Sequence, residues 1–103
     1  MRMLVKVNFP TAPGNEAMKS GAIPNKLKQI LDELKPEAAY FAEEDGERTA
    51  YLFVDMATPA DLPRIAEPFF LGFNARLTVR PAMTLDDLAS AGPAIERAIK
   101  NYA

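Results

Sequence analysis

The stretch AAYFAEEDGERTAYLFVDM, which begins at residue 38, constrains the fold most, because two apolar runs flank an Asp-Gly pair at 45–46. Asp-Gly is a favoured two-residue turn between antiparallel strands. Counting outward from this turn pairs Phe41 with Ala50 and Tyr40 with Tyr51. Directly opposed residues share one face of a sheet. The segment therefore predicts a β-hairpin with Phe41 on one face and both tyrosines on the other.

The second strand of this hairpin is apolar on both faces. Its core face carries alternate apolar residues, which are Ala50, Leu52, Val54 and Met56. The opposite face of an antiparallel strand is usually polar. Here it carries Tyr51 and Phe53, followed by Asp55. Something other than water is therefore expected to cover or use these two rings.

The spacing of apolar residues along the chain predicts the other strands and helices. Residues 3–9 and 75–81 alternate as strands, with Arg76, Thr78 and Arg80 facing away from the core. Apolar positions at helical spacing predict helices over 24–35 and from 59 to about 73. Pro24 is expected at the first position of the former, and Pro68 is expected to kink or divide the latter. We expect TAPGN (11–15) to be a loop, with one helical turn over 15–20.

The last twenty residues predict a helical tail. Thr84 and Asp87 have the spacing of a capping box, and Gly92-Pro93 should divide the tail into two short helices. Thr58 is likewise expected to cap the N-terminus of the helix that begins at residue 59.

This order of elements predicts an α+β fold of the ferredoxin-like, split β-α-β kind in one domain, residues 1–103. Two helices would cover one face of a four-stranded antiparallel sheet of order 4-1-3-2, and a helical tail would follow the last strand. The expected core contains Val5, Val7, Leu31, Phe41, Leu52, Val54, Phe69 and Leu77, and Phe70 and Phe73 are also expected to be buried.

Composition excludes several kinds of chemistry. The chain has no cysteine and no histidine, so thiolate nucleophiles, disulfides and Ser-His triads are ruled out. A net charge of −2 does not favour nucleic acid as a partner. Acidic residues around the hairpin turn lack the spacing of a calcium loop, so we expect no metal and no cofactor. No segment looks like a signal peptide or a membrane span, which predicts a cytoplasmic protein.

The third strand partly resembles the RNA-recognition motif, which stacks bases on an open sheet. Tyr51, Phe53 and Val54 match that motif, whereas Thr49, Ala50, Leu52 and Met56 depart from it. Binding of single-stranded RNA is therefore one alternative.

The chain as a whole resembles the dimeric α+β barrel superfamily, which includes cofactor-free monooxygenases and muconolactone isomerase. The run AEPFFLGFNARLTVRPAMTLDDL and the rest of the C-terminus are similar to an uncharacterised bacterial family of about this length. The resemblance implies a homodimer closed through the sheet face. It carries over no catalytic residue, and the lack of histidine separates this chain from many members.

The outward face is the candidate site. It would hold a small aromatic or anionic metabolite in a cavity closed by the partner, or serve only as a dimer interface. A cofactor-free enzyme is a further alternative, with Asp55 as the best candidate for a general base. The predicted ligand-binding residues are Lys6, Asn8, Tyr40, Tyr51, Phe53, Asp55 and Arg80.

Overall fold

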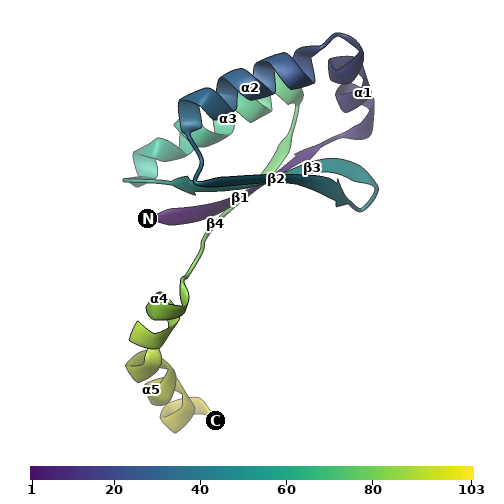
Figure 1. Ribbon diagram of the computed structural model, residues 1–103. Helices are drawn as coiled ribbons and strands as arrows, with labels where there is room; N and C mark the ends of the chain where they lie inside the picture. Colours follow the sequence, from purple (N-terminus) through teal and green to yellow (C-terminus); the bar gives the residue numbers. More distant parts are fainter.

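The computed structural model describes residues 1–103 and contains one sheet and five α-helices (Figure 1). The strands are β1 (Arg2–Phe9), β2 (Ala38–Glu44), β3 (Glu47–Asp55) and β4 (Arg76–Pro81). The helices are α1 (Thr11–Lys19), α2 (Ala22–Leu34), α3 (Leu62–Phe73), α4 (Leu85–Ser90) and α5 (Gly92–Tyr102), with a 3₁₀ turn over Pro59–Asp61. The fold is therefore α+β.

All neighbouring strands are antiparallel, and the strand order is β2-β3-β1-β4. The predicted hairpin register is confirmed, since Tyr40 pairs with Tyr51 and Phe41 pairs with Ala50. Asp45 and Gly46 have φ angles of 53° and 80°. Two consecutive positive φ angles are what a type I′ turn requires, and this turn matches the twist of the strands it joins.

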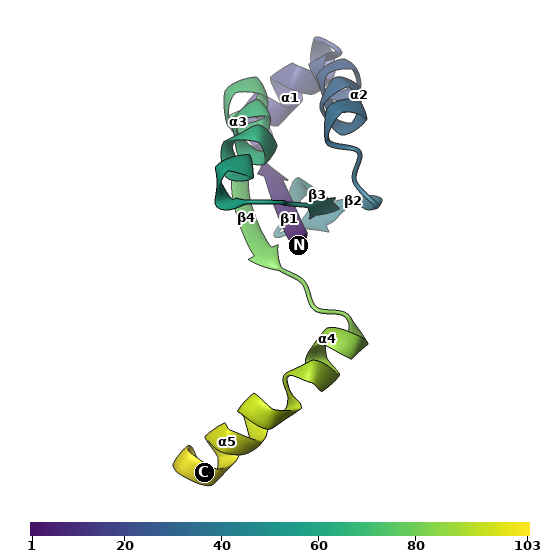
Figure 2. The ribbon, with the colours of Figure 1, turned by 90° about the vertical axis from the view of Figure 1, so that its left-hand side faces the viewer.

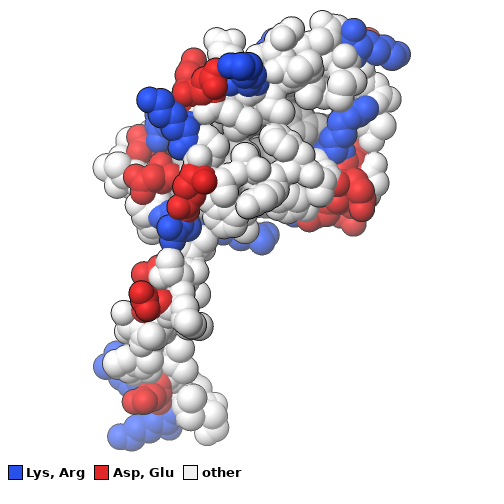
Figure 3. All heavy atoms as spheres, in the orientation of Figure 1, with Lys and Arg blue, Asp and Glu red and all other residues white.

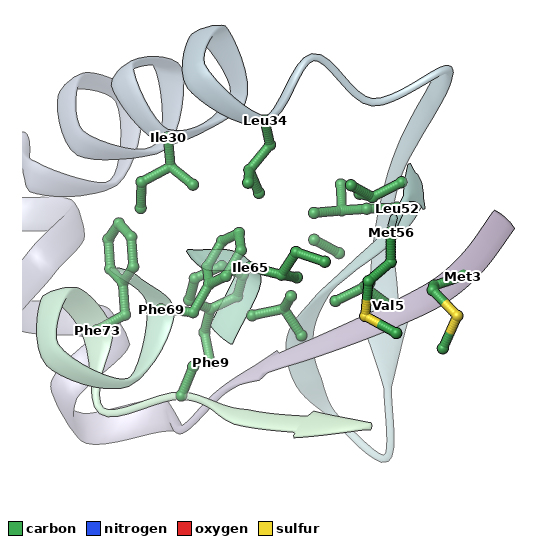
Figure 4. Packing of buried hydrophobic residues seen from close by; sticks show 14 residues of the cluster. Met3, Val5, Phe9, Ile30, Leu34, Leu52, Met56, Ile65, Phe69 and Phe73 are labelled. Carbon is green, nitrogen blue, oxygen red and sulfur yellow. The ribbon is translucent and has the colours of Figure 1, made fainter. Parts of the chain in front are cut away.

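Helices α1, α2 and α3 cover one face of the sheet, so three helices lie where two were predicted (Figures 1 and 2). The core lies between these layers (Figure 4). Of the predicted core residues, five are fully covered: Val5, Val7, Leu52, Val54 and Phe69. Leu31 and Leu77 are partly buried against them.

Phe41 was wrongly assigned to the core. Its register is as predicted, but its side chain is 56% exposed. β2 is an edge strand, and the helix layer leaves an apolar hollow of about 450 Å³ beside it. The hollow is lined by Phe9, Met18, Ile23, Leu27, Phe41, Ala42, Arg48 and Thr49. Register fixed the face of Phe41, but the extent of the helix layer decided its burial.

The first helical segment also differs from the prediction. The stretch 11–15 is the start of α1 and not a loop, and the amide of Gly14 donates to the carbonyl of Pro10 at 2.8 Å. Pro13 is tolerated because amides in the first helical turn have no intrahelical partner. Pro24 is the third residue of α2, which begins at Ala22, and not the first.

Pro68 does not divide the next helix, because α3 runs unbroken from Leu62 to Phe73. Ile65, Phe69 and Phe73 on its inner side are buried in the core. This packing offsets the loss of one backbone hydrogen bond. Phe70 is 42% exposed, so its predicted burial was wrong. Thr58 precedes the 3₁₀ turn, but its side chain makes no capping hydrogen bond.

The tail matches its prediction. Thr84 Oγ1 accepts from the amide of Asp87 at 3.1 Å, and the Asp87 carboxylate accepts from the amide of Thr84 at 2.9 Å. This capping box starts α4, and the break at Ala91 separates it from α5. Both helices extend away from the sheet, on the side opposite α1–α3 (Figure 1).

Candidate functional site

The sheet face opposite the helices carries all seven predicted ligand-binding residues. Strand pairing sets them in rows across the sheet. One row contains Arg80, Leu4 and Phe53, and the next contains Thr78, Lys6, Tyr51 and Tyr40. Successive rows on one face are roughly 7 Å apart. Aromatic and cationic side chains thus lie side by side on a face that no helix covers.

Lys6, Glu44 and Tyr51 form a hydrogen-bonded network on this face. Lys6 Nζ lies 2.6 Å from Glu44 Oε2, and the Tyr51 hydroxyl donates to Glu44 Oε1 at 2.7 Å. The hydrogen bond from Lys6, followed by that from Tyr51, holds the pKa of Glu44 below its usual value. The bond to the carboxylate raises the pKa of Tyr51, and partial burial adds to the effect. Tyr51 is therefore a proton donor at neutral pH and not a base.

A second polar cluster lies at the end of the face where β1 ends. Arg76 Nη2 donates to Asn8 Oδ1 and to Glu47 Oε1, both at 2.8 Å. Glu47 Oε2 also accepts from the amide and the hydroxyl of Thr11, at 2.8 and 2.9 Å. The Thr11 hydroxyl is the main cause of the lowered pKa of Glu47.

A shallow depression connects the two clusters. It has a volume of about 390 Å³ and is mostly polar. Its lining residues are Lys6, Asn8, Glu44, Asp45, Arg76, Leu77 and Thr78. Acidic side chains gather near the β2–β3 turn, and uncharged atoms separate them from charged groups at the other end of the sheet (Figure 3).

Asp55 lies at the opposite end of the face, apart from both clusters. It is paired in register with Arg2, and its carboxylate lies 2.8 Å from the N-terminal ammonium of Met1. Its side chain is 81% exposed. Arg2 binds Glu37, and this hydrogen bond lowers the pKa of the Glu37 carboxyl. In the single chain, Asp55 is thus ion-paired in water and not enclosed by aromatic rings.

Arg80 differs from the other cations of the face because it has no ion-pair or hydrogen-bond partner. Arg2, Lys6 and Arg76 each contact a carboxylate. Arg80 stands opposite Leu4, which in turn stands opposite Phe53. An unpaired guanidinium therefore lies in the same row as two apolar side chains.

Two site residues were missed from the sequence, Glu44 and Glu47. Both belong to the acidic residues around the hairpin turn, for which the sequence predicts no metal site, and they face each other across the hairpin. Counting two residues at a time from Tyr40 would have placed Glu44 on the same face. Its contact with Lys6 passes over the intervening strand β3, which local spacing does not reveal.

No three acidic, histidine or cysteine side chains are grouped so that they could hold a metal ion. No helix is both long enough and apolar enough to cross a membrane. No protein-family model matches the sequence, and no curated protein is significantly similar to it.

Proposed function

We propose that this protein is a homodimeric α+β barrel of ferredoxin-like topology that binds a small aromatic acid on its sheet face. Two copies would close their open faces on each other in the cytoplasm, and each would enclose a ligand against its partner. Support comes from the half-buried Leu4, Tyr51 and Phe53, which no helix of the chain covers. Exposed apolar patches on a soluble protein usually mark an interaction site.

The class of ligand is inferred from Arg80, whose guanidinium has no ion-pair or hydrogen-bond partner. A carboxylate bound there would meet an unpaired guanidinium, which can donate two parallel hydrogen bonds. The ring attached to that carboxylate would lie over Leu4 and Phe53, which follow Arg80 in the same row. Neighbouring strands are about 4.8 Å apart, so a single ring spans the distance from β4 to the middle of the sheet.

A thermal-shift series with benzoate tests this proposal. A ligand at one hundred times its dissociation constant stabilises the fold by about 2.7 kcal/mol, which shifts the melting temperature by roughly 10 °C in a domain of this size. Arg80→Ala should abolish the shift. Arg76→Ala is the matched control, because Arg76 has the same chemistry on the same strand and face but already binds Glu47. Equal effects of the two substitutions, or no shift with benzoate and related acids, would contradict the proposal.

Cofactor-free catalysis is a second candidate, favoured by the Tyr51–Glu44–Lys6 network. A tyrosine whose pKa is raised keeps its proton at neutral pH and can donate it to a developing oxyanion. Loss of turnover in Tyr51→Phe, with benzoate affinity unchanged, would separate this role from binding. Asp55 remains the candidate base only if the partner encloses it.

RNA binding is not favoured by the charges of this face. Three of its four cations are already paired with carboxylates, which leaves little positive charge for phosphates. Filter binding with single-stranded RNA at moderate salt distinguishes binding of an aromatic acid from binding of RNA. Tight RNA binding that weakens as the salt concentration rises would support the RNA alternative.

A further inference from the structure

Residues 84–103 form an arm that projects from the rest of the protein (Figures 1 and 2). The molecule measures 56 × 28 × 20 Å, and its radius of gyration is 16.9 Å. A compact chain of this length has a radius of gyration of about 13 Å. The excess comes from the arm, which consists of α4 and α5.

One side of the arm is apolar. Leu85 and Leu88 have helical spacing in α4, and Ile95, Ile99 and Tyr102 have it in α5. All five side chains are exposed, and Tyr102 is the most exposed, at 88%. Charged side chains lie along the other side of the arm (Figure 3). We call the five apolar residues the arm stripe.

The arm needs a surface to cover this stripe. Isolated helices shorter than about 12–15 residues are marginal in water. α4 has 6 residues and α5 has 11. Packing of an apolar side on another surface is what normally stabilises such helices. The core of the same chain does not provide that surface, because it lies beyond the sheet, under α1–α3 (Figure 1).

A second copy of the chain, docked on the open sheet face, would provide that surface. The arm leaves β4 on the side of the open sheet face, which is the side where the proposed dimer partner sits. The four strands have 6 to 9 residues each and lie about 4.8 Å apart, so they project an area of roughly 500 Å². A standard interface buries about 800 Å² on each partner. The sheet face alone is therefore small for a stable dimer, and the arm stripe supplies further apolar surface contiguous with it.

We propose that two copies exchange arms, each packing its arm stripe on the other copy. This inference rests on the proposed face-to-face dimer. In the proposed dimer the two-fold axis runs parallel to the strands, which would bring the β4 edge of one sheet over the β2 edge of the other. That edge carries Tyr40 and Phe41, which are 66% and 56% exposed. The partner's arm therefore begins at this edge near the level of Ala38, and Tyr40 on the open face and Phe41 on the helix face follow along β2.

Sedimentation equilibrium of the full chain tests the exchange. Ile99→Glu should raise the dimer dissociation constant at least tenfold, because a two-fold dimer contains the altered contact twice. Lys100→Glu is the matched control, since it introduces the same residue one position away, on the charged side, and should change the constant less than threefold. Both positions are exposed in the single chain, so both variants should fold.

A spin label shows whether the contact is between copies, and the lack of native cysteine makes its attachment specific. Ala103→Cys carrying a nitroxide is mixed with a ¹⁵N-labelled chain that has no label. Broadening of amides in the ¹⁵N chain, which carries no nitroxide, supports exchange, and the absence of any broadening in that chain overturns it. A wild-type dimer that Ile99→Glu leaves intact overturns the arm contact alone. A wild-type monomer overturns both the arm contact and the proposed dimer.

Discussion

Phe41 and Phe69 offer a direct test of how far the helix layer covers the sheet. Both are phenylalanines assigned to the core by sequence, but Phe69 is 0% exposed and Phe41 is 56% exposed. A fully buried phenylalanine removes about 200 Å² from water, which is worth about 5 kcal/mol at 25 cal/mol per Å². Less than half of that area is buried at Phe41, which corresponds to about 2 kcal/mol.

Replacement by alanine should therefore have unequal effects. We expect Phe69→Ala to lower the free energy of unfolding by about 4 kcal/mol, since it also leaves a cavity. We expect Phe41→Ala to lower it by about 1–1.5 kcal/mol, because its site opens to solvent and area estimates are upper bounds. Urea unfolding followed by circular dichroism measures both, with Phe69→Leu as a milder variant if Phe69→Ala does not fold. Equal losses would mean that the hollow beside β2 is closed. A loss at Phe41 that grows with protein concentration would place a second copy over it.

Three further outcomes follow from individual contacts. Glu44→Gln should lower the pKa of Tyr51 toward its ordinary value, because the hydrogen bond to the carboxylate raises it. The absorbance of tyrosinate at 295 nm, followed against pH with the other two tyrosines replaced by phenylalanine, measures this pKa. An unchanged pKa would show that the contact does not exist. The folded-state pKa of Glu37 is lowered by Arg2, so its stabilisation is present above the unfolded pKa and is lost as the pH falls through the folded pKa; Glu37→Gln should flatten the acid side of the stability profile, and an unaltered profile would argue against the pair. Thr84→Ala should destabilise α4 by about 1 kcal/mol, seen as faster amide exchange in 85–90 with the urea midpoint of the sheet unchanged.

The parts of the fold set by local geometry could be predicted from sequence. An Asp-Gly turn accepts positive φ at both positions, and this fixed the hairpin register and the faces of Tyr40 and Tyr51. The capping box at Thr84 is equally local, because its two hydrogen bonds join residues three apart.

Features that depend on distant packing were not predictable in the same way. The exposure of Phe41 depends on where α1 and α2 end over an edge strand, which no spacing within β2 encodes. Proline and glycine between 11 and 15 favour a loop, yet tertiary packing kept the segment helical and Gly14 buried. The Lys6–Glu44 contact reaches over a whole strand, so charge order along the chain gave no sign of it.

Ligand binding and dimer formation should be coupled, because Arg80 lies just before the arm. β4 ends at Pro81, so a carboxylate held by Arg80 would sit at the base of the arm and under the proposed partner. Coupling between binding events is reciprocal, so two benzoates must together tighten the dimer by the product of the factors by which the dimer tightens each of them. We expect the dimer dissociation constant to fall about tenfold or more at saturating benzoate, measured by sedimentation equilibrium, and not to change with benzoate in Arg80→Ala. Benzoate that binds with equal affinity to monomer and dimer would show that the site is complete in one chain, and that the partner is not part of it.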